Sequence, residues 1–284
     1  MCSRYKLIII GVYLAGCVNG QTSSPKTYFL KHQQKNKTDS LEEATENQTQ
    51  FRFQAGYANK VIFAGRDFGV KQPGATFGTS YHHQSGLNIE YEGSYWSGME
   101  NKYAMTEVGA YYEKTILKDL DLTAGYWKLF YHNGDDEERK MFTNFFLLDE
   151  SWYTSLGQVN ASYFFITGEQ LGHRLDINLS KSLDLYHCLR ADKITVEPTF
   201  TFTFATVNYI SFLSSYMKET NVSQNAFKIG NYEFTLPLTY KKLGKYELNA
   251  SWHRAWPVAI PGEDKPDPVS YFTVELIRML LVKK

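Results

Sequence analysis

One stretch of the chain constrains the fold more than any other. Residues 194–206, ITVEPTFTFTFAT, alternate between apolar and polar side chains along most of their length. A period of two is that of a β-strand, in which successive side chains point to opposite faces of the sheet. One face carries Phe200, Phe202 and Phe204, whereas the other carries hydroxyl groups and Glu197. The two faces of this strand are therefore expected to meet different media, one apolar and one aqueous.

The same alternation recurs at similar length in residues 86–96, 171–179, 232–240 and 245–255. Strands of soluble proteins usually run to about five or six residues, whereas a tilted strand that crosses a bilayer needs roughly nine to eleven. We expect twelve strands in all, with ends uncertain by about two to four residues. They lie near residues 51–64, 74–83, 86–97, 104–116, 119–131, 140–149, 154–166, 171–183, 194–206, 226–241, 244–256 and 269–281.

The pattern predicts an all-β fold, an antiparallel up-and-down transmembrane β-barrel of about twelve strands. The strand number is even, short and long connections largely alternate, and aromatic residues gather near strand ends, as in outer-membrane barrels. Two connections break the alternation. Residues 167–170 make a short connection at the end of the barrel where the others are long, and residues 184–193 make a long connection at the end where the others are short. No apolar run beyond the first two dozen residues is long enough for a membrane helix.

The chain divides into three expected parts. Residues 1–20 have a basic start, an apolar stretch and small residues, which is typical of a secretory signal peptide. Residues 21–50 are polar and predict a disordered periplasmic tail, and residues 51–284 are expected to form the barrel. Cleavage before Gln21 and a lipoprotein-type cut at Cys17 both remain open.

Composition argues against nucleic-acid binding and leaves two main interpretations, a membrane barrel and a soluble β-protein. Formal net charge is zero, so no basic surface points to nucleic acid. The main alternative is a secreted or lipid-anchored soluble β-barrel or sandwich that turns its apolar faces inward and binds a small apolar ligand. Alternation alone cannot separate the two, because it shows that the faces differ without showing which one lies inside.

The first predicted strands resemble a known family. YANKVIFAG at residues 57–65, followed by Gln72-Pro73, Ser80-Tyr81 and Ser85-Gly86-Leu87, is similar to the opening of the TorF-like outer-membrane porin family. The resemblance is clearest over residues 57–97 and implies a bacterial outer-membrane barrel. Where that family typically shows Phe-Arg-Gly, this chain has Phe63-Ala64-Gly65-Arg66, so the resemblance assigns no role to Arg66.

The polar faces of the strands supply the candidate site. If the apolar faces meet lipid, a set of mostly acidic side chains lines the pore, because a charge facing lipid at midplane would cost roughly 2–4 kcal/mol for Arg or Lys. These residues are Glu90, Glu92, Glu107, Glu113, Arg174, Asp176, Glu197, Glu233, Glu247, His253 and Glu275. We expect a porin-like channel or small-solute binding protein of the bacterial outer membrane, with a weak preference for cations. Expected partners are outer-membrane lipids, lipopolysaccharide and small solutes, and the oligomeric state is left open.

Catalysis is the weakest of the alternatives. An outer-membrane phospholipase family shows His-x-Ser on one strand, whereas Ser251-Trp252-His253 has the reverse order and lies on the expected lumen face. Cys188 beside His187 does not form a nucleophilic pair on an extended chain, since neighbouring side chains point apart. We expect a protein that is not an enzyme and that uses no cofactor and no metal.

Overall fold

The computed structural model describes residues 48–63, 65–67, 73–98, 102–132, 142–186, 192–210, 226–242 and 245–282. The predicted signal peptide and nearly all of the predicted tail lie outside these residues and stay predictions. The strands are β1 (Gln50–Ala58), β2 (Ile62–Phe63), β3 (Arg66–Asp67), β4 (Gly74–His82), β5 (Leu87–Trp96), β6 (Tyr103–Leu117), β7 (Leu120–Tyr131), β8 (Asn144–Tyr153), β9 (Gln158–Thr167), β10 (Leu171–Ser180), β11 (Leu183–Tyr186), β12 (Asp192–Val196), β13 (Thr199–Thr206), β14 (Phe227–Lys242), β15 (Tyr246–Pro257) and β16 (Val269–Leu281). Among the described residues, no helix is long and apolar enough to span a bilayer.

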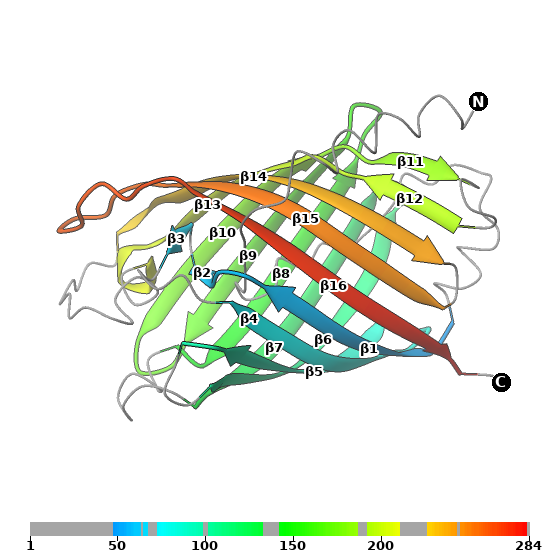
Figure 1. Cartoon of the computed structure of the whole chain (residues 1–284). Helices are drawn as coiled ribbons and strands as arrows, with labels where there is room; N and C mark the ends of the chain where they lie inside the picture. Colours follow the sequence, from blue (N-terminus) through cyan, green and yellow to red (C-terminus); the bar gives the residue numbers. More distant parts are fainter. Residues whose placement is uncertain are drawn as a thin grey trace.

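The large sheet closes on itself as an antiparallel barrel (Figure 1). Neighbouring wall strands pair in turn around the ring, with β10 beside β13 and β11 beside β12. The ring closes at β1, where Gln50 lies opposite His82 of β4 on one side and Leu281 of β16 on the other. Closure satisfies the backbone hydrogen bonds of the edge strands internally, which an apolar surrounding requires. The prediction of a twelve-stranded up-and-down barrel is confirmed, with β10 and β11 counted as one wall strand and β12 and β13 as another.

One of the two irregular connections, at residues 184–193, has a structural explanation. Strands β12 and β13 follow one another along β14, with Val196 opposite Leu238 and Thr199 opposite Thr235. Pro198, which lacks a backbone donor, separates them. The long connection on the short side is therefore the β11–β12 hairpin, which continues two neighbouring wall strands alongside the last residues of β14.

The expected strand ends lie within four residues of the observed ones except at the first strand, which we expected over residues 51–64 and which ends at Ala58, so that Ile62–Phe63 form the separate strand β2. The next largest difference is at β8. We expected a strand at residues 140–149, and β8 instead spans Asn144–Tyr153. The reason is that Phe142 precedes the strand and packs inside the barrel, where it is fully buried, while Trp152 and Tyr153 belong to the strand end.

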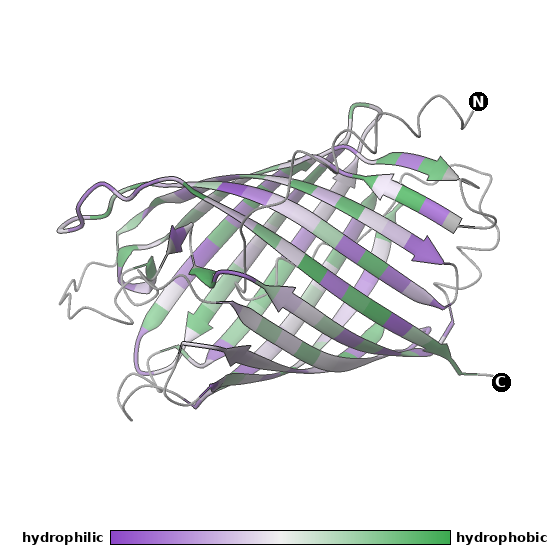
Figure 2. Cartoon of the chain, in the orientation of Figure 1, coloured by the Kyte–Doolittle hydropathy of each residue, from purple (hydrophilic) through white to green (hydrophobic). Residues whose placement is uncertain are grey.

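The outer face is apolar and the inner face is polar over much of the barrel, and hydropathy alternates along the strands in Figure 2. On β5, Leu87, Ile89 and Tyr91 are exposed, whereas Glu90 and Glu92 are buried. Exposed large apolar side chains recur on the other strands. A soluble barrel with its apolar faces inward, the main alternative, is thus not the arrangement found.

Strand direction places the connections at two ends. The connections 59–73, 97–102, 132–143, 168–170, 207–226 and 258–268 share one end, here called the loop end. The opposite end, here called the turn end, has the connections 83–86, 118–119, 154–157 and 243–245, the β11–β12 hairpin, the start of β1 and the end of β16. The interior, or lumen, differs sharply between these ends.

Candidate functional site: the lumen

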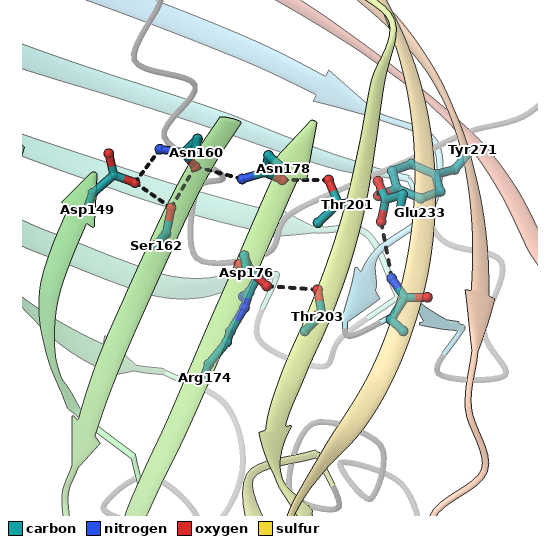
Figure 3. A network of polar contacts seen from close by, with 11 residues as sticks. Asp149, Asn160, Ser162, Arg174, Asp176, Asn178, Thr201, Thr203, Glu233 and Tyr271 are labelled. Atoms are coloured by element: carbon teal, nitrogen blue, oxygen red, sulfur yellow. Dashed lines mark hydrogen bonds and ion pairs between the residues drawn. The ribbon is translucent and has the colours of Figure 1, made fainter. Parts of the chain in front are cut away.

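A ladder of polar side chains crosses the inner face from β8 to β13 in the half of the lumen nearer the turn end (Figure 3). Asn160 Nδ2 donates to Asp149 Oδ1 at 2.8 Å, and Ser162 Oγ donates to the same carboxylate oxygen. Asn178 Nδ2 donates to Asn160 Oδ1 at 2.8 Å, and Thr201 Oγ1 donates to Asn178 Oδ1 at 2.6 Å. All five residues are buried, so the ladder gives hydrogen bonds to groups that would otherwise be costly to hold away from water.

A buried ion pair lies one step nearer the loop end on β10. Arg174 Nη2 is 2.6 Å from Asp176 Oδ2, and Thr203 Oγ1 donates to Asp176 Oδ1 at 2.8 Å. The guanidinium also lies over the ring of Phe164, 5.5 Å from its centroid. Arg174 therefore stands where the polar ladder meets apolar side chains.

A third group joins β14, β15 and β16. Glu233 Oε1 accepts from the Tyr271 hydroxyl at 2.6 Å and lies 2.9 Å from His253 Nδ1. The rings of His253 and Tyr271 stack with centroids 4.2 Å apart and planes 5° apart. Because Glu233 also lies within reach of the Thr235 hydroxyl, at 3.3 Å, its carboxylate is held in one orientation.

Three further carboxylates lie close to one another on β5 and β6. Glu92 is directly opposite Glu107 in the register, and Glu90 is two residues away on the same face. Trp127 Nε1 donates to Glu90 Oε1 at 2.5 Å, and Gln54 Nε2 donates to Glu92 Oε2 at 2.5 Å. The pairing of like charges on facing strands is unfavourable, and these donors offset part of that cost.

Every residue predicted to line the pore lies on the inner face, although not all are brought together. Glu90, Glu92, Glu107, Arg174, Asp176 and Glu247 are buried, while Glu113, Glu197, Glu233, His253 and Glu275 are half-buried. Glu197 lies at the turn end and accepts from Ser180 and Ser182, and Glu275 accepts from Asn249 at 3.1 Å. Their role as the lining of a conducting pore stays a prediction.

The lumen is not evenly filled. Inner-face side chains from β5 to β10 and on β13 are mostly buried, whereas many on β14, β15, β16 and β1 are half-buried. The half-buried group includes Asn249, Ser251, Thr273, Arg52 and Gln54. Solvent-accessible space in the lumen therefore borders the wall made by β14, β15, β16 and β1.

Sequence reasoning missed two kinds of residue. Asp121, Asp149, Arg52 and Lys193 also lie on the inner face, and the same period of two, extended along their strands, would have placed them there. Lys193 Nζ is 3.1 Å from Asp184 Oδ2 in the β11–β12 hairpin.

The second kind is a set of buried apolar residues in the long connections. These residues, here called the mouth cluster, pack among inner-face side chains at the loop end, and short apolar runs such as VNYI were their only sequence signal. They are Val61, Ile62, Phe142, Val207, Tyr209, Ile210 and Ile260.

The Ser251 and His253 pair does not form a hydrolase-like contact in the structure. The hydrogen bonds of His253 go to Glu233, Thr235 and Thr273. The described residues contain no group of three or more His, Cys, Asp or Glu side chains that could hold a metal ion. Cys188 lies outside the described residues, and the absence of enzyme activity stays a prediction.

Comparisons with known proteins found likeness in structure alone. Neither a protein-family model nor a curated protein sequence matches the chain. The KdgM porin superposes with a TM-score of 0.46 at 10% identity, over 81% of this chain and 98% of that chain. The NanC porin gives 0.43 at 11% identity over 80% and 98%, and LpxR from Salmonella typhimurium gives 0.47 at 9% identity over 81% and 99%. These likenesses are at low identity, and they assign the chain to no family.

Proposed function

We propose that this protein is a bacterial outer-membrane barrel of the porin type that passes or binds small solutes and weakly prefers cations. The observation that carries the proposal is the combination of an apolar outer face with an inner face on which carboxylates outnumber Lys and Arg. The inner acids are Glu90, Glu92, Glu107, Glu113, Asp121, Asp149, Asp176, Glu197, Glu233, Glu247 and Glu275, and the inner Lys and Arg residues are Arg52, Arg174, Lys193 and Lys241. Lumen charge of one sign favours counter-ions of the other.

A bilayer location follows from the energetics of the outer face. Phe53, Phe77, Ile89, Leu148 and Leu276 are among the large apolar side chains left exposed on the strands. A continuous apolar surface of this kind would be costly in water and is matched by hydrocarbon. The resemblance of residues 57–97 to TorF-like porins supports the same location. Contact with outer-membrane lipids and lipopolysaccharide belongs to this proposal.

Electrical recording tests the channel. The purified protein is reconstituted into planar bilayers under a KCl gradient. We expect its reversal potential to be displaced from zero toward the equilibrium potential of potassium. Glu275→Gln removes a half-buried lumen charge and should lower the potassium preference by about two- to fivefold, the effect of one charge at close range in a water-like medium.

Glu150→Gln is the matched control, because Glu150 lies on the outer face opposite Leu122 and Ala161. It should leave the reversal potential unchanged. Chloride preference in the unaltered protein, or equal effects of the two substitutions, would contradict a cation-preferring lumen.

A further inference from the structure

The loop end of the lumen contains a hairpin of the chain's own backbone. Strands β2 and β3 pair through Ile62 opposite Asp67 and Phe63 opposite Arg66, and in Figure 1 they lie at the loop-end mouth of the barrel. Val61 packs in the same cluster as Trp96 of β5, and its Cγ2 lies 3.4 Å from the position of a β-carbon built on Gly74. The hairpin thus touches the inner side of the β4–β5 wall.

The other side of the hairpin touches the wall made by β14, β15 and β16, which is separated from β4 by β1. Ile62, 3% exposed, packs with Ala255 of β15 and with Val269 and Tyr271 of β16. Gly65 lies so close to Asn231 of β14 that an added β-carbon would clash with the Asn231 side chain. Its φ of +74° also favours glycine. The described residues 61–63, 65 and 66 therefore contact both the β4–β5 wall and the β14–β16 wall.

Arg66 fastens this hairpin to two other segments. Its Nε and Nη2 donate to Glu263 Oε1 and Oε2 at 2.7 and 2.9 Å, a bidentate pair with the loop between β15 and β16. Nη1 donates to the Gly230 carbonyl at 3.1 Å and Nη2 to the Val258 carbonyl at 2.5 Å. Glu263 in turn accepts from the Ile260 amide at 3.1 Å. The guanidinium, on a residue only 4% exposed, therefore links the hairpin, the start of β14 and the β15–β16 loop.

The geometry points to a latch: Arg66 and Glu263 hold the β2–β3 hairpin against the inner wall at the loop-end mouth, and release of the pair lets the hairpin move and widens the lumen. The hairpin residues Val61 and Ile62 contact the wall by apolar packing, whereas Arg66 supplies the directional contacts. A bidentate arginine-carboxylate pair has a defined geometry and is stronger than a neutral hydrogen bond. The lumen is then a gated compartment whose exchange with the loop side depends on the contacts that Arg66 makes with Glu263 and with the Gly230 and Val258 carbonyls.

This inference rests on the proposed function for its consequence, but the movement of the hairpin can be measured without ion flow. Ile62→Cys places a thiol on the hairpin, in a chain whose native cysteines are replaced by serine. A charged maleimide reacts with that thiol only when the hairpin leaves its packed position. The probe is compared in the purified full barrel, in detergent, with and without substitution of the latch.

Arg66→Ala and Glu263→Gln, each combined with Ile62→Cys, should raise the rate at which maleimide labels the introduced thiol at least about tenfold, as expected when a closed state loses a charge-assisted contact. Lys265→Ala is the control, because Lys265 is an exposed charge two residues from Glu263. It should leave the rate unchanged. Faster migration of unboiled than boiled samples on a gel shows that each variant retains a closed barrel, and Glu263→Gln carries the test if Arg66→Ala does not fold.

The same variants recorded in planar bilayers separate the latch from the proposed function. Faster labelling with a rise in open probability supports both. Faster labelling without conductance in any variant supports the latch and overturns the channel. Labelling at the rate of the Lys265→Ala control in both latch variants overturns the latch, whatever the conductance.

Discussion

The two halves of the lumen are built from the same strands but from different chemistry. Along β8, Phe145 and Leu147 point inward near the loop end, and Asp149 and Ser151 point inward near the turn end. Along β9 the order is reversed with the chain direction, from Asn160 and Ser162 to Phe164 and Ile166. The change occurs at the same height on neighbouring strands. This comparison shows that the two-residue period of a strand sets which side chains face inward. The position of a side chain along the strand then decides whether the interior around it is polar or packed with apolar groups.

The largest expected effect on the free energy of unfolding comes from the Arg174–Asp176 ion pair, which lies at the boundary between the polar and apolar halves of the lumen. Arg174→Ala leaves Asp176 buried without its ionic partner, and such losses cost about 3–5 kcal/mol. We expect a corresponding fall in the free energy of unfolding, measured by denaturant titration in detergent or lipid. Adding Asp176→Asn to this variant should recover part of the loss, because the buried charge is then removed. A loss below about 1 kcal/mol, as for exposed pairs, would show that the boundary pair is hydrated.

Two isoleucines, one inside the lumen and one on the outer face, give a matched test of how tightly the apolar half of the lumen is packed. Ile166 on β9 is fully buried in the lumen, whereas Ile177 on β10 faces outward. Ile166→Ala should lower the free energy of unfolding by about 2–5 kcal/mol because it leaves a cavity. Ile177→Ala should cost clearly less, because lipid or detergent can fill the space. Equal losses in the same titration would mean that the loop-end interior is not tightly packed.

The smallest effect concerns the latch carboxylate and pH. Burial raises the pKa of Glu263, but the hydrogen bonds from Arg66 and the Ile260 amide and the charge of Arg66 outweigh burial, so the pKa lies below its usual value. The stabilisation is therefore complete above the ordinary carboxyl pKa of about 4.3 and is lost as the pH falls through the lowered pKa.

The measurement is the difference in unfolding free energy between the unaltered chain and Glu263→Gln. This difference should be constant from about pH 5 to 7 and shrink in more acidic buffer. If this difference in unfolding free energy stays constant down to the lowest pH at which the protein remains folded, protonation of Glu263 does not affect the stability of the loop end.

Much of the barrel could be predicted, because alternation in strands such as 86–97 and 194–206 is a local property of the sequence. The inward direction of Glu90, Asp176 and His253 followed from the cost of placing charge in lipid. The side on which the solvent-accessible space lies could not be foreseen, since it depends on how side chains from non-neighbouring strands fill the lumen.

The loop-end interior was equally beyond sequence reasoning. Arg66 meets Glu263, a residue distant in the chain, only after the ring has closed and two loops have turned inward. A charged residue in a polar connection carries no local signal of burial, and neither does Tyr209 in the connection after β13. Non-local packing of this kind is set by the closed wall, so it becomes visible only once the wall is known.

The β11–β12 hairpin has a consequence for self-association. Strand β11 stands at one end of the strand order of the large sheet and, among the described strands, pairs with β12 alone, so its far side offers backbone groups to any extended chain that approaches. Its four residues include Asp184. Short edge strands resist the growth of intermolecular sheets, so an edge of only four residues limits the pairing that a second chain could make with β11.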